Sequence, residues 1–417
     1  MNDSPSTHNP MRIALVIERY DPAGGGAERS TAQIAEELAR RGHHVTVIAG
    51  CIPDSVEPGA VELQPIGRGH LHGALKLAQF RQRAMRALAA GGFDTSLSVT
   101  PVVPAAVVQP RAGVIGELHR RSIAWRGSSA GRAVKRIALA LNAKQQAMRA
   151  MERRTMASPM VQRVVAISRY MAEQLQRDYA LPSERVELIP NAAAMPNLAG
   201  EEREQVRRRL REGFAIPEGA TVFLFAAMDP RRKGFEPLLA ATRRLADEER
   251  ELVVLLAGAI EYPQHRAVAD AGLSGHVRFV GPTQRMPALY AAADVTVLPT
   301  FYDPASKVVI ESLMMGTPAI STVFNGASDQ IQPEGGGQPR GRVIGDPADI
   351  AALAEAMAEL MDPAERERCR AATAGLAEQL SMARHVDRLE AVLAATVGGE
   401  ATTQPTPAPS PSGRGLG

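Results

Sequence analysis

Cysteine, aromatic side chains and long apolar runs are all scarce in this 417-residue chain. The two cysteines, Cys51 and Cys369, lie far apart and form no CxxC pair, which argues against a zinc site or a disulfide framework. No run of about 18 apolar residues occurs, so no helix is expected to span a membrane. The N-terminal sequence MNDSPSTHNP lacks the charged and apolar regions of a secretion signal, and a cytoplasmic location is expected.

Positive and negative charges nearly balance in the chain as a whole, but they are unevenly distributed along the sequence. The formal net charge is +3, yet residues 111–154 contain eleven Lys or Arg residues against the two carboxylates of Glu117 and Glu152. Such a concentration of cations in a near-neutral protein favours an acidic partner surface. No aromatic stacking platform accompanies these cations, which argues against nucleic acid as the partner.

Part of this basic segment has a helical pattern. Residues 118–157 are expected to form one or more helices, and four apolar residues recur among the cations at helical spacing, namely Val134, Ile137, Leu141 and Met148. The segment from Leu118 to Arg154 has three interpretations: a peripheral helix on an anionic membrane surface, a site for phosphates of an acceptor, or a solvated helix face. We take the membrane surface as the working hypothesis.

Short apolar runs alternate with helical patterns along the whole chain. The runs suited to buried strands are residues 11–17, 45–49, 95–99, 105–108, 164–167 and 186–189, followed by 221–227, 252–257, 277–280, 295–299 and 318–323. This alternation predicts an α/β protein with two doubly wound, Rossmann-like parallel sheets. Because such sheets bind ligands at the carboxyl ends of their strands, two facing domains would create one cleft.

Composition sets the expected domain boundaries. Polar, proline-bearing sequence follows Pro190, so a boundary is placed near Asn197, between an N-terminal domain of residues 11–196 and a C-terminal domain of residues 197–375. Residues 376–397 are expected to form a final helix. Residues 1–10 and the low-complexity tail 398–417 are expected to be disordered.

Two turns after predicted strands carry residues suited to phosphate groups. Gly25 and Gly26 open a helix, where glycine lets the backbone approach a ligand and the helix N-terminus favours an anion. Arg232 and Lys233 follow the strand at residues 221–227, where two cations are well placed for a diphosphate. The simpler explanations are a tight turn required by the fold and a solvated run of charges.

Two carboxylates mark the segment of residues 301–329. Asp303 and Glu311 stand eight residues apart, and residues 305–315 have the pattern of a helix. The helix N-terminus would suit a phosphate, and the carboxylates would hold neutral hydroxyls such as those of a sugar. A buried carboxylate in an apolar helix needs partners, which favours a functional Glu311 over an exposed one. The segment therefore predicts a clamp for a sugar nucleotide.

Residues 303–311 resemble the E-x7-E signature of the retaining glycosyltransferases of family 4, which have the two-domain GT-B fold and include enzymes of the lipopolysaccharide core. Asp303 replaces the first glutamate of that signature, with a reach one methylene shorter. The resemblance implies that Glu311 accepts hydrogen bonds from the ribose hydroxyls and that Asp303 contacts the transferred sugar. It also implies that the amides of Ser306, Lys307 and Val308 reach the phosphate.

The resemblance extends to the two turns and to the end of the chain. It implies that Arg232 and Lys233 bind the donor's pyrophosphate and that Gly25 and Gly26 lie at the junction of donor and acceptor. It further implies that the last helix crosses back to the first domain.

The implied reaction moves a sugar such as glucose from a UDP-sugar donor to a hydroxyl of a glycan or lipid-linked acceptor, such as lipopolysaccharide core. No cofactor or metal is expected, because no D-x-D triplet stands at a strand end. A first-domain side chain should lie beside the transferred sugar, with His119 as the candidate and Arg111 as the alternative. Two rival functions remain: a UDP-sugar epimerase of the same architecture, and a non-catalytic, membrane-associated relative of the transferases.

Overall fold

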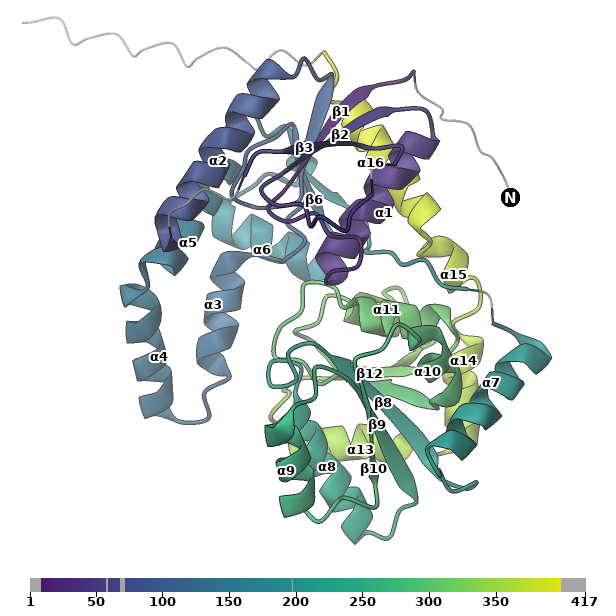
Figure 1. The fold of residues 1–417 in the computed structure, drawn as a ribbon. Coiled ribbons are helices and arrows are strands. Elements are labelled where there is room, and N and C mark those ends of the chain that lie inside the picture. The colour runs from purple at the N-terminus through teal and green to yellow at the C-terminus, as the bar shows by residue number, and fades with distance from the viewer. Residues whose placement is uncertain (1–8, 58, 68–71, 197, 399–417) are drawn as a thin grey trace, which may run out of the picture.

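A computed structural model describes residues 9–57, 59–67, 72–196 and 198–398. The disorder predicted for the two ends falls almost wholly outside these ranges, and so does the boundary residue Asn197. The described chain folds into two α/β domains, which Figure 1 shows one above the other. This arrangement confirms the predicted fold class of two parallel-sheet domains.

The first domain is built on a seven-stranded parallel sheet. Its strands run in the order β3 (Glu62–Pro65), β2 (His44–Ala49), β1 (Arg12–Ile17), β4 (Thr95–Ser98), β5 (Val107–Val108), β6 (Arg163–Ala166) and β7 (Val186–Leu188). In β1, Ile13 and Leu15 pack into one apolar cluster and Ala14 and Val16 into another. Because successive strand residues point to opposite faces, the sheet needs helices on both sides.

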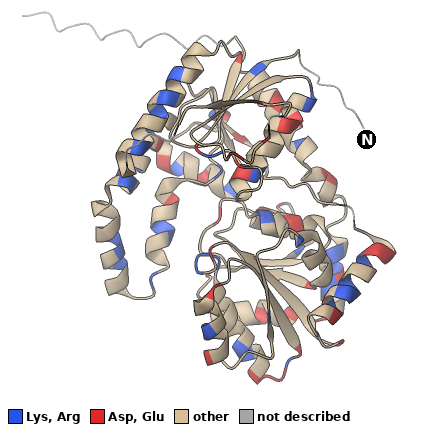
Figure 2. Cartoon of the chain, viewed as in Figure 1, with Lys and Arg blue, Asp and Glu red and all other residues tan. Residues whose placement is uncertain are grey.

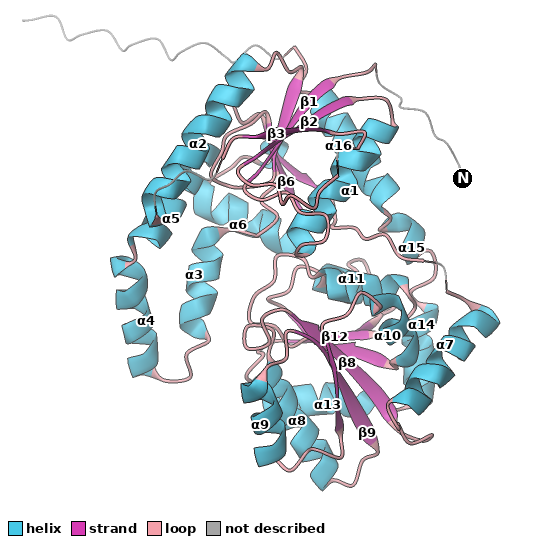
Figure 3. Cartoon of the chain, in the orientation of Figure 1, coloured by secondary structure: helices cyan, strands magenta, loops and turns pink. Residues whose placement is uncertain are grey.

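Helices supply that cover (Figure 3). The helices of this domain are α1 (Gly26–Arg40), α2 (Gly73–Ala90), α3 (Ile115–Ala124), α4 (Ser129–Leu141), α5 (Ala143–Met156) and α6 (Arg169–Tyr179), with a 3-10 turn at Ser183–Arg185. Residues 118–157, which were expected to form one or more helices, thus belong mainly to three helices, α3, α4 and α5. Figure 1 shows α3 and α4 extending from the first domain alongside the second.

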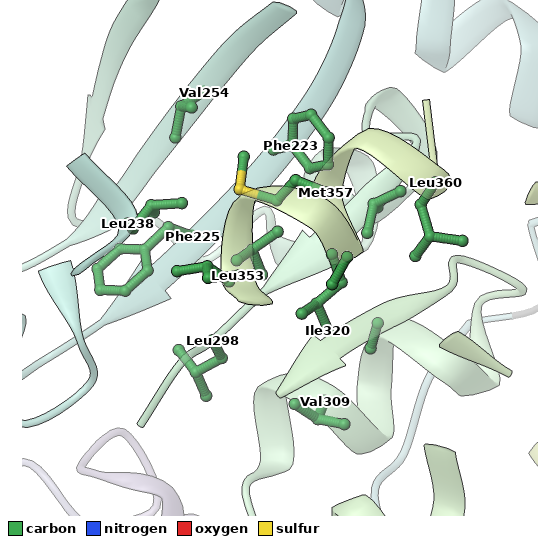
Figure 4. Close-up of a cluster of buried hydrophobic side chains, with 14 of the residues drawn as sticks. Phe223, Phe225, Leu238, Val254, Leu298, Val309, Ile320, Leu353, Met357 and Leu360 are labelled. Carbon is green, nitrogen blue, oxygen red and sulfur yellow. The ribbon is translucent and has the colours of Figure 1, made fainter. Parts of the chain in front are cut away.

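The second domain has a six-stranded parallel sheet. Its order is β10 (Val277–Gly281), β9 (Leu252–Gly258), β8 (Thr221–Ala227), β11 (Val295–Val297), β12 (Ala319–Thr322) and β13 (Gly341–Ile344). All seven residues of β8 are buried. Phe223 and Phe225 point into the cluster of Figure 4, whereas Val222 and Leu224 pack on the opposite face.

Helices flank the strands of the second domain. They are α7 (Gly200–Gly213), α8 (Phe235–Asp247), α9 (Tyr262–Asp270), α10 (Met286–Ala292), α11 (Lys307–Met314), α12 (Ser328–Ile331), α13 (Ile350–Glu359) and α14 (Pro363–Ala371). Leu353 and Met357 of α13 pack with the phenylalanines of β8, as Figure 4 shows. Of the helices described, none is long and apolar enough to cross a membrane.

The end of the described chain returns to the first domain. The single helix predicted for residues 376–397 is instead two, α15 (Leu376–Gln379) and α16 (Met382–Ala394). The hydroxyl of Ser381 accepts a hydrogen bond from the amide of Arg384 at 3.3 Å and so caps the second helix. Leu389 of α16 belongs to the first-domain core beside α1, and Arg41 pairs with Glu390 at 3.0 Å. The crossover is therefore confirmed, with a break at residues 380–381.

One of the four residues predicted to form an apolar stripe in the basic segment does not belong to it. Met148 lies on α5 and packs against the first-domain core, because the chain turns at Asn142 between α4 and α5. Val134, Ile137 and Leu141 stay together on α4, a helix with no buried residue. The exposed stripe therefore ends at Leu141.

Candidate active site

Glu311 is held inside the second domain by helix α11. Its residue is 8% exposed, and its carboxylate accepts a hydrogen bond from the hydroxyl of Tyr290 at 2.8 Å. Burial raises the pKa of this carboxyl, while the charges of Lys307 and Arg29 act in the opposite direction. A carboxylate has about four acceptor sites, so capacity remains for ligand hydroxyls.

Helix α11 begins at Lys307, two residues later than the sequence predicted. The cause lies in two side chains that take up the preceding amides: Asp303 accepts from Ala305 at 3.1 Å, and Asn325 accepts from Ser306 at 3.1 Å. The amide of Ser306 is therefore already used, contrary to the expectation that it reaches a phosphate. Lys307 and Val308 are among the first helical residues, whose amides have no partner within a helix.

Asp303 and Lys233 form an ion pair between two loops of the second domain. Their side chains are 11% and 14% exposed. The turn that carries Lys233 is fastened to the loop after β11, because Phe301 donates from its amide to the carbonyl of Arg232 at 3.0 Å. A side chain at Gly234 would place its Cβ 2.1 Å from the carbonyl oxygen of Pro299, so only glycine allows this approach.

Arg232 lies nearer the rim than its neighbour. Its side chain is 37% exposed, and its Nε is 3.3 Å from the carboxylate of Asp229. The two cations predicted to bind a diphosphate therefore differ in exposure: Lys233 is largely enclosed and paired with Asp303, whereas Arg232 is half-exposed and lies beside Asp229.

The glycine turn of the first domain meets α11 of the second. Gly25 precedes the first residue of α1, and its amide donates to Glu28 at 2.8 Å. A Cβ on Gly26 would lie 3.6 Å from Cδ of Lys307. The ammonium of Lys307 donates to Gln33 of α1 at 3.4 Å. The N-terminal turns of α1 and α11 thus approach each other across the domain boundary.

A buried guanidinium lies close to this junction. Arg111 is 6% exposed and donates to Gln109 at 2.8 Å and to Asn191 at 2.6 Å. Asn191 in turn donates to the carbonyl of Ala305, just before α11, at 2.9 Å. Burial lowers the pKa of Arg111 to about 10. This arginine, considered from sequence only as an alternative to His119, is tied to the loop that carries Asp303.

Several further contacts hold the Asp303 loop against the first domain. The hydroxyl of Tyr302 accepts from the amide of Val114 at 3.1 Å, and the hydroxyl of Ser168 donates to the carbonyl of Pro304 at 2.6 Å. The rings of Trp125 and Phe301 stack with centroids 5.2 Å apart. The segment that carries the carboxylates is therefore shared between the two domains.

Two family models divide the chain much as its two domains do. Residues 24–193 match Glycosyltransferase Family 4, and residues 206–375 match Glycosyl transferases group 1. A probable transglycosylase of Burkholderia thailandensis is 30% identical over 374 residues, which cover 88% of this chain and 92% of that protein. The chain belongs to the GT-B glycosyltransferases. The 2-deoxystreptamine glucosyltransferase of Streptomyces kanamyceticus is 28% identical over 184 residues, or 42% of this chain and 45% of that enzyme.

Solved structures show the same fold at low sequence identity. WaaG, a glycosyltransferase involved in lipopolysaccharide biosynthesis, superposes with a TM-score of 0.73 at 19% identity, covering 93% of this chain and all of that one (100%). Anabaena HepE in complex with UDP and glucose gives a TM-score of 0.65 at 17% identity, covering 92% of this chain and 100% of HepE. These likenesses support the two-domain architecture of this glycosyltransferase.

His119 occupies a different place from the other predicted site residues of this glycosyltransferase. It lies on α3 and is 7% exposed, and its Nε2 is hydrogen-bonded to Gln145 of α5 at 2.9 Å. None of its described contacts is with Asp303, Glu311 or the glycine turn. The structure thus brings together the glycines, Lys307 and Glu311, and separately Lys233 and Asp303, but does not bring His119 to either group.

No candidate metal site is found in the part of the chain that the structure describes. No group of three or more His, Cys, Asp or Glu side chains is arranged there to hold a metal ion. Beside Glu311, the charged groups that act on Lys307 are the cations Arg111 and Arg29. Such groups can neutralise a phosphate directly.

Proposed function

We propose that this glycosyltransferase moves a sugar, with glucose as the first candidate, from a UDP-sugar to a hydroxyl of a lipid-linked or glycan acceptor, with retention of configuration. The observation that carries the proposal is the approach of Gly26 to Lys307, with Glu311 on the same helix. Groups suited to phosphate and a carboxylate suited to hydroxyls thus lie at one junction of two domains, which supports the proposal. UDP and glucose bound to the similarly folded HepE support a UDP-sugar donor, and the likeness to WaaG supports a lipopolysaccharide acceptor.

The proposed roles follow from the chemistry of the side chains. Glu311 would accept hydrogen bonds from the ribose hydroxyls, and Asp303 would contact the transferred sugar. Arg232, Lys233 and the amides of Lys307 and Val308 would hold the phosphates. The bond between the anomeric carbon and the phosphate oxygen breaks, the acceptor oxygen forms the new bond, UDP leaves with the bonding electrons, and the proton of the acceptor hydroxyl passes to the departing phosphate oxygen. Cations and amides fixed before the reaction would stabilise the departing diphosphate.

A donor and acceptor screen tests this proposal. The full chain is incubated with UDP-glucose, UDP-galactose and UDP-N-acetylglucosamine, with and without truncated lipopolysaccharide core, and UDP release and anomeric configuration are measured by NMR. Acceptor-dependent release with a retained anomeric configuration is expected. An epimerised sugar formed without acceptor would favour the epimerase alternative, and UDP binding without any turnover would favour a non-catalytic role.

We also propose that α4 places the enzyme on an anionic membrane surface, at the cytoplasmic face. Val134, Ile137 and Leu141 are 66%, 60% and 81% exposed and lie on one side of the helix. Lys and Arg residues of the segment from Leu118 to Arg154 accompany them, and Figure 2 shows blue turns along this helical extension. Apolar residues beside cations match the interface of a bilayer with acidic headgroups.

Vesicle sedimentation tests the membrane contact. Wild type should bind vesicles that contain phosphatidylglycerol more strongly than neutral phosphatidylcholine vesicles, and salt should weaken this binding. A triple Val134→Ser, Ile137→Ser, Leu141→Ser variant should lose vesicle binding while retaining UDP binding. Binding that is insensitive to both lipid charge and the triple substitution would contradict the proposal.

A further inference from the structure

Two side chains at the end of α3, one helical turn apart, contact the second domain. Trp125 directly follows the helix, and its amide donates to the carbonyl of Arg121 at 2.9 Å, so the two residues lie on one face. The guanidinium of Arg121 lies over the ring of Phe324, 3.7 Å from its centroid. The ring of Trp125 stacks on Phe301 with centroids 5.2 Å apart. These two pairs, the α3 contact, join a first-domain helix to the loops after β11 and β12.

Both phenylalanines of the α3 contact border Asp303. Phe301 lies two residues before it in the chain, and the amide of Asp303 donates to the carbonyl of Phe324 at 2.9 Å. The carbonyl of Asp303 in turn accepts from the amide of Gly326 at 2.9 Å. The backbone that carries this carboxylate therefore lies between two residues that α3 touches. A shift of either phenylalanine would move the Asp303 backbone with it.

The end of α3 is itself fixed in the first domain through Glu117. This residue is 2% exposed, and its carboxylate accepts hydrogen bonds from Nε of Arg121 at 2.7 Å, from the hydroxyl of Tyr170 at 2.9 Å and from Arg177 at 2.8 Å. Burial raises the pKa of Glu117, but its arginine and tyrosine partners outweigh burial and lower the pKa to about 2. Arg121 is thus held along one edge by an ionised carboxylate while its face lies on Phe324.

The indole of Trp125 is engaged by the chain itself. Besides its stack on Phe301, with 20° between the ring planes, it has the guanidinium of Arg126 over its ring, 5.8 Å from the centroid. Aromatic stacks and cation–π contacts depend on geometry, so they fix how two surfaces meet. The rings of the α3 contact are therefore better suited to holding the two domains in register than to presenting an open platform to a ligand.

We propose that Trp125 and Arg121 are positioning residues, which hold Phe301 and Phe324 from the first domain and so keep Asp303 where it contacts the transferred sugar. This rests on the proposed function, because Asp303 is taken to act on that sugar. The nucleotide is held by other groups, so loss of the α3 contact should slow sugar transfer more than it weakens donor binding. The Asp303 side of the site is then complete only while α3 lies on the second domain.

Steady-state kinetics of sugar transfer by the full chain test this role. Trp125→Ala should lower kcat by about 10- to 100-fold, the loss that a misplacement of about 1 Å can cause, and change the KM for the UDP-sugar by less than about threefold. Trp125→Phe, which can still stack on Phe301, should restore most of kcat. Phe301→Leu should add little to the loss in Trp125→Ala, because both changes remove the same contact. Leu75→Ala, at an apolar residue of α2 that is 61% exposed, is the matched control and should change neither constant.

The intrinsic fluorescence of the protein reports the same contact without any turnover. Trp125 is the only tryptophan of the chain. In Phe301→Leu its emission should shift to longer wavelength and its quenching by acrylamide should increase, because the indole loses the ring that stacks on it. Phe279→Leu, at a phenylalanine that stacks on His265 instead, is the matched control and should leave both properties unchanged.

Three results would overturn the inference: an unchanged kcat in Trp125→Ala, equal losses in Trp125→Ala and Trp125→Phe, or unchanged emission and quenching in Phe301→Leu. An increase in KM with kcat retained would also contradict a positioning role. Transfer at the same rate by wild type and Trp125→Ala refutes this inference alone. Failure of wild type to transfer sugar from any donor would instead refute the proposed function, and the role assigned to the α3 contact with it.

Discussion

Replacing Glu311 with glutamine should lower nucleotide affinity without lowering stability. The substitution keeps the shape of the side chain and an oxygen that can accept from Tyr290, whose hydroxyl lies 2.8 Å from the carboxylate. What it removes is a negative charge in a residue that is 8% exposed. Ligand binding and folding should respond in opposite directions to that loss, which makes Glu311→Gln informative.

The size of the effect on binding follows from the hydrogen bonds that the charge would make. A hydrogen bond to a charged group contributes about 1.5 to 3 kcal/mol. Glutamine can still accept one ribose hydroxyl, so we expect a loss of about 2 to 3 kcal/mol, or about 30- to 150-fold in UDP affinity. The effect on folding has the other sign. Burial raises the pKa of Glu311, so its ionised form opposes folding near neutral pH, and the neutral glutamine should unfold at the same temperature or higher.

A thermodynamic cycle that combines Glu311→Gln with a modified ligand separates the contribution of the ribose hydroxyls from other effects of the substitution on affinity. UDP and its 2′,3′-dideoxy analogue are titrated into wild type and Glu311→Gln, and thermal unfolding is followed by circular dichroism. The substitution should cost little affinity for the dideoxy analogue, because the hydroxyls that Glu311 would hold are absent. An equal loss for both ligands would refute the ribose assignment. A large drop in melting temperature would refute the reasoning about the buried charge.

Three further predictions concern the domain boundary and pH. Gly113→Ala should lower stability by about 1 to 3 kcal/mol in urea unfolding, because φ is +87° and a Cβ would lie 2.1 Å from the hydroxyl of Tyr302; Tyr302→Phe should relieve part of this. Burial lowers the pKa of His385 from 6.5 to about 3, so stability should fall as pH drops below 6.5, by about 1.4 kcal/mol per pH unit, and His385→Gln should lack this component. UDP affinity of wild type should decline as pH rises through about 8, where Lys307 loses its proton, while Lys307→Arg should stay flat. A flat wild-type profile would contradict the last prediction.

Local pattern was sufficient for the central strands and for the edge strands β7 and β10, but it missed the other two edge strands. β8 has the predicted bounds, because an unbroken apolar run is required where both faces of a strand are covered. The edge strands β3 and β13 were not predicted, since Glu62–Pro65 and Gly341–Ile344 contain no continuous apolar run. β13 begins with Gly341, which lies so close to the carbonyl of Ala319 that a Cβ would be 1.8 Å away. That requirement is visible only once the strands are paired.

Some residues of the candidate site could likewise be predicted from local sequence, whereas some of its contacts join residues that are distant in the sequence. Asp303, Glu311 and Lys233 could be named because each follows a strand or lies on a short helix whose pattern is local. The sequence did not predict that Asn325 takes the amide of Ser306, although the two residues are only 19 apart. It could not show that Lys307 meets Gln33, a pair 274 residues apart. The contact of Lys307 with Gln33 depends on how the two domains are placed, which no periodicity encodes.

The segment of residues 301–329, which carries Asp303 and Glu311, also makes contacts between the two domains. Phe301 stacks on Trp125, and Tyr302 and Pro304 are hydrogen-bonded to first-domain residues, immediately beside the Asp303 carboxylate. Contacts that hold the domains together therefore lie within a few residues of the groups proposed to hold the donor. Separation of the domains would break these contacts and withdraw Lys307 from α1 at the same time. Donor binding and domain closure are thus expected to be coupled, so that each favours the other, because the same loop and helix contribute to both.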